Sequence, residues 1–245
     1  AEVRRFNLAN MTASANARTL SFTPGEGTLR NPMMLSASPD VLAYVETVVP
    51  GDNRLAVYAM SGELLRMQEN AQNQNWPRVS PDGRLLAKTR IDETRSKQDI
   101  WVEDLERGTQ HPVTSAMLPD ISPVWSPDGR QLAFMTGPLP GRPGERHLNI
   151  AAAGTGIVHT WPCPVGYCEP TDWSADGSRL LVNTLNAGNW DVWVVSTAPG
   201  GGAEALLTAG FAEKDARFAP NGRWVAYVSE DAGRPEVSVR TENGP

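Results

Sequence analysis

The acidic residues of this sequence are the first candidates for chemistry, because three of them recur in one setting. Asp82, Asp128 and Asp176 each precede a glycine, and the first two also follow Ser-Pro. An aspartate at such a place hydrogen-bonds backbone amides within its own turn. We therefore expect these carboxylates to shape turns rather than to act as acids or bases.

Motifs of the common catalytic and cofactor-binding sites are absent from the sequence. It has no Gly-x-Ser-x-Gly nucleophile elbow, no glycine-rich phosphate loop and no His-Glu-x-x-His zinc helix. The three histidines, His111, His147 and His159, stand at unlike positions, whereas a metal site would need them to converge with carboxylates. The sequence therefore predicts a protein that is not an enzyme and that holds neither a metal ion nor a cofactor.

Charge and hydropathy argue against two further classes. The 245 residues include 22 Lys and Arg against 28 Asp and Glu, a net charge of −6, and nucleic-acid binding requires a basic face. No apolar run approaches the roughly 20 residues of a membrane span. We expect no nucleic-acid partner and no membrane insertion. The 22 glycines and 20 prolines instead indicate many turns between short elements.

The two cysteines, Cys163 and Cys168, are five positions apart. Without histidine partners they cannot form a four-ligand zinc site. The alternatives are a local disulfide across a turn, which suits an oxidising compartment, and two free thiols near a loop. The chain starts at Ala1 without a methionine. A mature, processed or excised domain fits such a start. A bridge would favour the periplasm or another extracytoplasmic compartment of a bacterium.

One short motif recurs five times and determines the expected architecture. It begins at Ser38, Ser80, Ser126, Ser174 and Ala219, at intervals of 42, 46, 48 and 45 residues. A period of this length is typical of four-stranded propeller blades. In its full form the motif reads Ser-Pro-Asp-Gly, which favours a turn whose glycine is left-handed. Apolar runs of strand length follow each turn, so the sequence predicts an all-β propeller with five recognisable repeats.

Aromatic residues also stand at repeated places. Trp101 and Trp193 occupy the same place in two repeats, and Trp125, Trp173 and Phe218 directly precede the motif in three. A ligand-stacking role is conceivable for them. Packing of blade against blade explains a repeated aromatic better, so we expect these side chains to be core.

The motif and its surroundings resemble a known family. Residues 124–134 and 216–229 look like the repeat of TolB-type propellers, also called the WD40-like or PD40 repeat. Together with residues 233–237, the second stretch resembles propellers attached to bacterial eukaryotic-like serine/threonine kinases. The resemblance covers about residues 31–240 and implies a TolB-like ring of five or six blades.

We expect one propeller domain over residues 1–245, with the five repeats in 31–240. The last repeat stops after its third strand, at Arg240. Residues 1–30 contain two strand-like segments, 3–8 and 18–22. One of them could complete the last blade and seal the ring, which would remove an exposed sheet edge.

A channel mouth is the expected place for a binding site, because the first strand of each blade lines the axis of a propeller and the loop before it surrounds one opening. Mixed charges and an aromatic side chain there suit a polar ligand or a protein loop, although ordinary solvated residues are the alternative. The candidates are Asn75, Arg78, Asp120, Tyr167, Glu169, Asp172, Glu213, Lys214, Asp215 and Arg217. Asn75, Asp120, Glu169 and Lys214 are expected at comparable places in loops, where varied chemistry would break the symmetry of the ring.

Three functions fit these expectations. The leading one is a non-catalytic binding or sensing module that recognises a protein or a polar ligand at a channel mouth. The second is a gating propeller domain of a larger serine peptidase, whose hydrolase domain would lie outside this chain. The third is a stand-alone propeller hydrolase or lyase, which would need clustered axial carboxylates or histidines with a metal ion.

Overall fold

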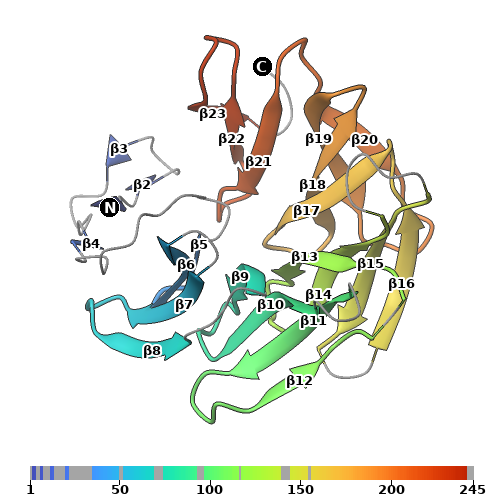
Figure 1. The fold of residues 1–245 in the computed structure, drawn as a ribbon. Coiled ribbons are helices and arrows are strands. Elements are labelled where there is room, and N and C mark those ends of the chain that lie inside the picture. Colours follow the sequence, from blue (N-terminus) through green and yellow to red (C-terminus); the bar gives the residue numbers. More distant parts are fainter. Residues whose placement is uncertain are drawn as a thin grey trace. The chain divides into compact units, whose positions relative to one another are not determined.

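A computed structural model gives the fold of this chain (Figure 1). The residues that it describes are 2–3, 6–7, 12–13, 20–21, 35–49, 52–68, 74–92, 97–115, 117–138, 144–153 and 156–241. Every regular element in these ranges is a β-strand, which confirms the all-β prediction. The same ranges contain no helix that could cross a membrane.

The chain divides into two compact units, residues 1–117 and 118–245. The first unit contains two four-stranded antiparallel sheets in which consecutive strands pair. Such meanders are propeller blades, and we call them blades 1 and 2. Blade 1 consists of β5 (Leu35–Ala37), β6 (Val41–Val49), β7 (Asp52–Ala59) and β8 (Leu64–Gln68). Blade 2 consists of β9 (Gln74–Val79), β10 (Leu85–Asp92), β11 (Lys97–Asp104) and β12 (Gln110–Pro112).

The second unit contains two further four-stranded blades and one blade with three described strands. Blade 3 consists of β13 (Asp120–Trp125), β14 (Gln131–Thr136), β15 (His147–Ala152) and β16 (Gly156–Pro162). Blade 4 consists of β17 (Tyr167–Trp173), β18 (Arg179–Asn186), β19 (Asn189–Ser196) and β20 (Ala203–Leu207). Blade 5 consists of β21 (Glu213–Phe218), β22 (Trp224–Ser229) and β23 (Glu236–Thr241). The five sheets follow the five motifs, as the repeat predicted.

Four short strands are described near the N-terminus. They are β1 (Glu2–Val3), β2 (Phe6–Asn7), β3 (Thr12–Ala13) and β4 (Leu20–Ser21). β1 pairs with β4 and β2 pairs with β3, while the one described partner of β23 is β22. Most of residues 1–30 lies outside the described residues. Closure of the last blade by this segment therefore stays a prediction, as does the single domain over residues 1–245.

The motif forms the turn between the first and second strands of a blade. In blade 2 the Ser80 hydroxyl donates a hydrogen bond to Asp82 Oδ1 (2.6 Å), and the Leu85 amide donates to Ser80 Oγ (2.9 Å). Gly83 follows with a φ of 75°, which side chains rarely tolerate. The serine–aspartate bond recurs between Ser126 and Asp128 and between Ser174 and Asp176. These bonds lower the pKa of all three carboxyls and confirm their role in turns.

The first strands of three blades are kinked at one repeated position. Trp76, Ser122 and Asp215 each stand four residues before their motif, with φ of 50°, 58° and 57°. The pairing between first and second strand shifts register there. A left-handed residue other than glycine costs roughly 1–3 kcal/mol and persists where its surroundings hold it. The kinks therefore indicate that contacts between blades fix the first strands.

The core lies between neighbouring blades. Between blades 1 and 2 it comprises Val41, Leu55, Val57, Val79 and Leu86, all buried. The second unit has equivalent clusters on both faces of blade 4. Trp125, Trp173 and Phe218 belong to the buried set, at 6%, 7% and 8% exposure. The prediction of core packing is therefore confirmed for these three residues, whereas Trp101 and Trp193 are half-buried.

Candidate functional site

The residues that the sequence offered as binding candidates all lie on first strands of blades. β9 carries Asn75 and Arg78, β13 carries Asp120, β17 carries Tyr167, Glu169 and Asp172, and β21 carries Glu213, Lys214, Asp215 and Arg217. The expectation that some of them lie in the preceding loops was wrong. Each first strand begins before these residues or at them, and it pairs with the second strand of its blade from there.

Four candidates do not share one place in their repeats as expected. Asn75, Glu169 and Lys214 stand five residues before their motif, but Asp120 stands six before it. Ile121 takes the comparable place in blade 3. Register in a strand is set by its pairing partner, whereas the loops before the strands differ in length. Counting back from each motif, rather than from the start of each segment, finds this offset of one residue.

A buried polar cluster forms where β17 begins. The Ser122 hydroxyl of blade 3 donates to Glu169 Oε1 (2.6 Å), and the Tyr167 hydroxyl donates to Glu169 Oε2 (3.3 Å). Ser122 is fully buried, while Tyr167 and Glu169 are only 5% and 4% exposed. Burial, followed by the nearby Glu169 charge, raises the pKa of Tyr167 far above its usual value. The phenol therefore stays neutral and keeps donating a hydrogen bond to the Glu169 carboxylate.

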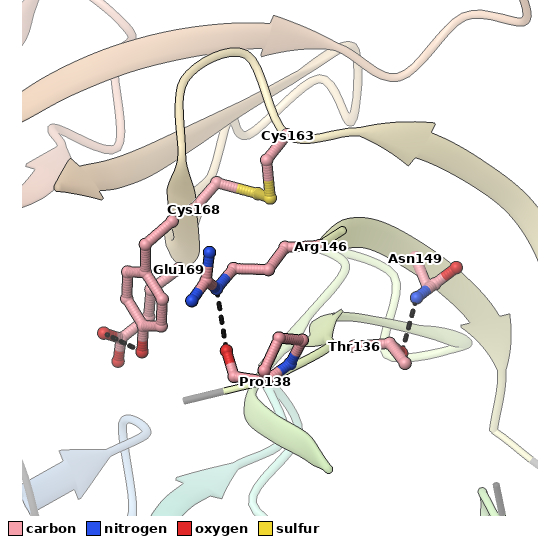
Figure 2. Close-up of a disulfide and its surroundings, with 8 residues drawn as sticks. Thr136, Pro138, Arg146, Asn149, Cys163, Cys168 and Glu169 are labelled. Atoms are coloured by element: carbon pink, nitrogen blue, oxygen red, sulfur yellow. Dashed lines mark hydrogen bonds between the residues drawn. A yellow bond between two sulfur atoms is a disulfide. The ribbon is translucent and has the colours of Figure 1, made fainter. Parts of the chain in front are cut away.

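A disulfide borders this cluster (Figure 2). Cys163, just after β16, and Cys168, on β17, are joined, with their Cα atoms 5.4 Å apart. The guanidinium carbon of Arg146 lies 5.8 Å from the centre of the Tyr167 ring, and Arg146 Nε donates to the Pro138 carbonyl (2.7 Å). The bridge thus fixes the residue between Tyr167 and Glu169. Sequence reasoning had left the bridge and two free thiols open.

Asp120 takes part in a ladder that crosses blade 3. The Thr136 hydroxyl donates to Asp120 Oδ1 and accepts a bond from Asn149 Nδ2 (2.7 Å). The Thr160 hydroxyl in turn donates to Asn149 Oδ1 (2.7 Å). Asp120 is 1% exposed, so its carboxylate stabilises the blade rather than facing a partner.

Two other candidate carboxylates connect blade 4 with blade 5. Asp172 Oδ2 accepts a hydrogen bond from the Phe218 amide (2.7 Å). Asp215 donates its backbone N–H to Asn183 Oδ1 (2.9 Å) and accepts a bond from Asn183 Nδ2 (3.2 Å). The second pair holds the left-handed kink of β21. Both carboxylates therefore have structural partners in the neighbouring blade.

The basic candidates are more accessible. Lys214 is half-buried, with its Nζ 3.8 Å from a Glu230 carboxylate oxygen. Arg78 and Arg217 are half-buried at the same place in their repeats, and each donates to the carbonyl of the preceding residue. The ion pair of Lys214 and the hydrogen bond of Arg217 stay within blade 5, so these two side chains can contact a polar partner without breaking a bond between blades.

Two exposed apolar residues near the strand starts were missed by the sequence reasoning. Leu118 precedes β13 and is 48% exposed, and Phe211 precedes β21 and is 36% exposed. Each stands eight residues before the first motif residue of its blade, Ser126 or Ala219. That shared spacing was the signal that could have found them.

Metal binding has no support in the part of the chain that the structure describes. No group of three or more His, Cys, Asp or Glu there could hold a metal ion. The described cluster around Glu169 is built for hydrogen bonding between blades.

Comparison with known families decides what this architecture is. The model of the TolB beta propeller domain, PD40, matches residues 25–244. The chain belongs to the PD40 family of TolB-type propellers. This membership confirms the resemblance drawn from the Ser-Pro-Asp-Gly repeats and the propeller fold class. The likeness to kinase-attached propellers stays a prediction.

Two curated proteins match parts of this chain. The uncharacterized peptidase YuxL of Bacillus subtilis is 23% identical over 203 residues, 65% of this chain and 30% of YuxL. The Tol-Pal system protein TolB of Alcanivorax borkumensis is 36% identical over 70 residues, 29% of this chain and 15% of that protein. This chain thus spans less than a third of the length of these curated relatives.

A solved TolB structure shares the fold. TolB from Acinetobacter baumannii superposes with a TM-score of 0.69 at 19% identity, covering 95% of this chain and 56% of that chain. At this identity the likeness concerns the fold alone.

Proposed function

We propose that this PD40 propeller is a non-catalytic binding module that recognises a protein partner where its first strands begin. Three residues of the second unit represent this strand-start surface: Leu118, Phe211 and Lys214. A polar small ligand, the other occupant expected from the sequence, is an outcome of the test below.

The exposure of Leu118 and Phe211 at one shared register carries the proposal. Large apolar side chains exposed in loops on a rigid scaffold are typical of protein contact sites. The loops precede β13 and β21, and both of these strands pack against β17. Lys214, three residues after Phe211 and half-buried on β21, supplies a polar contact at the rim.

The polar residues beneath this surface support a role without catalysis. Glu169 accepts bonds from Ser122 and Tyr167, and Asp215 is bonded to Asn183 of the neighbouring blade. Ser122 is fully buried, so its hydroxyl is not available as a nucleophile. These groups hold the strand starts in place, and a rigid base lowers the entropic cost of binding.

The relationship with YuxL favours a second candidate, a gating domain of a larger peptidase. In that function the same propeller would control access to a hydrolase domain encoded outside these 245 residues. The sequence of the complete gene distinguishes the two, because the second requires an adjoining hydrolase segment with a nucleophile elbow.

An extracytoplasmic location forms part of the proposal. Its support is the Cys163–Cys168 disulfide, because such bridges persist mainly in oxidising compartments. Thiol alkylation in intact cells of the source organism, before lysis, tests it. Immediate labelling of both cysteines would contradict it.

Site-specific photocrosslinking tests the binding surface. A photoreactive phenylalanine replaces Leu118 or Phe211 in the protein expressed in its own cells. The matched control is Leu65 on β8, an equally exposed apolar residue on an outer strand (49%). We expect a protein adduct of one defined mass from Leu118 and Phe211, and Lys214→Glu should weaken it.

Adducts of the same mass and yield from Leu65 would contradict the proposal. So would the absence of any adduct at Leu118 and Phe211 together with a small polar molecule retained by the purified protein.

A further inference from the structure

The outer part of blade 4 contains a cavity at the end opposite to the strand-start surface. Its volume is about 270 Å³, and Arg179, Val194, Ser196, Gly202, Ala203 and Glu204 line it. These residues lie at the start of β18, the end of β19 and the start of β20. Blade 5 packs against this face of the sheet through the cluster that contains Val194 and Phe218.

The cavity brings opposite charges to one face of the sheet. Arg179 pairs with Ser196 across β18 and β19, and Val194 pairs with Glu204 across β19 and β20. Directly paired residues point to the same side of a sheet, so all four side chains share one face. The Arg179 guanidinium lies 5.7 Å from the centre of the Phe218 ring, and Val194 is buried. A cation, an anion and an apolar floor therefore line one small space.

Arg179 is peculiar to blade 4. In every blade the first residue of the motif donates its amide to one carbonyl at the start of the second strand, and that carbonyl identifies equivalent positions. Arg179 occupies this position in blade 4. The equivalents in blades 1, 2, 3 and 5 are Val41, Leu85, Gln131 and Trp224. The other four blades pack with an uncharged side chain at this position. The repeat therefore does not require the Arg179 guanidinium.

Glu204 is also peculiar to blade 4. It pairs with Val194, and the equivalent pairs in blades 1, 2 and 3 join Val57 with Arg66, Val102 with His111, and Ile150 with His159. Blade 4 thus has an acid where blades 1 to 3 carry a basic side chain. His111 and His159 share this place, so the expectation that all three histidines stand at unlike positions was wrong for these two. The two residues that break the repeat line the same cavity, as expected of a site on a symmetric scaffold.

At the equivalent place between blades 1 and 2, one residue from each blade forms an ion pair. There Arg66 Nη1 lies 2.6 Å from Glu103 Oε1. Between blades 4 and 5 the charges are reversed, with Glu204 in place of Arg66 and Arg240 in place of Glu103. Arg240 donates instead to the Leu206 carbonyl (3.0 Å). Among the described residues Glu204 forms no ion pair, and its side chain is exposed.

We propose that this cavity binds a small zwitterion, an α-amino acid with a short side chain. The carboxylate would bind the guanidinium of Arg179, whose planar donors match a carboxylate. The ammonium group would pair with Glu204, and the side chain would lie against Val194. A cavity of about 270 Å³ is just below the usual range for small-molecule sites, which limits the ligand to a small one. This site is independent of the strand-start surface.

Calorimetric titration of the whole chain with L-alanine tests the proposal. Acetate, which has only the carboxylate, and methylamine, which has only the ammonium group, are titrated for comparison. Two variants copy residues from other blades and so should fold: Arg179→Gln, as in blade 3, and Glu204→His, as in blades 2 and 3. The control Arg223→Gln removes an exposed arginine of a motif turn. We expect saturable binding of L-alanine, weaker by about tenfold or more in either variant and unchanged in the control, since a bond to a charged group contributes about 1.5–3 kcal/mol.

Amide NMR spectra of the wild-type chain provide a readout that does not depend on the variants. L-alanine should shift the signals of Ser196 and Ala203 and leave those of blade 2 unchanged. Acetate binding as tightly as L-alanine would overturn the zwitterion. No saturation, or equal loss in Arg223→Gln, would overturn the site.

Discussion

Lys88 and Glu103 form an ion pair in the interior of the first unit, with Lys88 Nζ 2.7 Å from Glu103 Oε2 and both side chains at 0% exposure. Glu103 also accepts bonds from Arg66 and Gln68 of blade 1 and from Gln110 of its own blade. Burial, only partly offset by Glu103, lowers the pKa of Lys88. One carboxylate thus joins two blades and compensates a buried ammonium group.

Glu103→Ala should destabilise the chain by about 3–5 kcal/mol, because it leaves a buried lysine without its counter-ion. Chemical denaturation followed by tryptophan fluorescence measures the effect. The control is Arg234→Ala, which breaks an exposed pair with Glu236 and should cost less than about 1 kcal/mol. An equal loss of unfolding free energy in the two variants would contradict the prediction that a buried ion pair matters more than an exposed one.

Gly129→Val should destabilise blade 3 by about 1 kcal/mol or more. Gly129 has a φ of 69° in its motif turn, and a β-branched residue is strained there. Gly210→Ala is the matched control, because its φ is not left-handed and no atom lies within 4 Å of the added Cβ. A melting temperature that Gly129→Val leaves unchanged would contradict the turn assignment.

Reduction of the Cys163–Cys168 bridge should lower the free energy of unfolding by about 2 kcal/mol, since the closed loop is short. The double variant with serine at both positions should behave like the reduced protein. Thiol counting under native, oxidising conditions should find none, and equal stability of the oxidised and reduced chains would contradict a stabilising role.

Acid should weaken the motif turns. Hydrogen bonds from the Ser174 hydroxyl and from the Ser178 amide and hydroxyl lower the pKa of Asp176 from 3.8 to about 2. The unfolded chain therefore binds the proton first, so the stabilisation is complete above about pH 4 and is lost as the pH falls through about 2. Urea midpoints measured across this window should fall less steeply for Asp176→Ala than for the wild type. Asp231→Ala, outside the motif turns, is the control, and identical slopes for all three proteins would contradict the turn contribution.

The sequence by itself determined the turns and the strand repeat. Ser80, Asp82 and Gly83 interact within five residues, so their geometry is local and recurs wherever the motif recurs. The period of the motifs then specified five blades, and their aromatic residues could be assigned to the core. The motif also carried the family resemblance that the match to PD40 confirmed.

Only the tertiary structure decided which polar residues serve the scaffold. Glu169 accepts a bond from Ser122, 47 positions earlier, and Asp172 accepts one from the amide of Phe218, 46 positions later. In the sequence both carboxylates looked like candidates for binding. Such contacts depend on how one blade packs against the next, and no local pattern records which side chains meet. The residues that we propose for recognition are the exposed or symmetry-breaking side chains that remain once the packing between blades is accounted for.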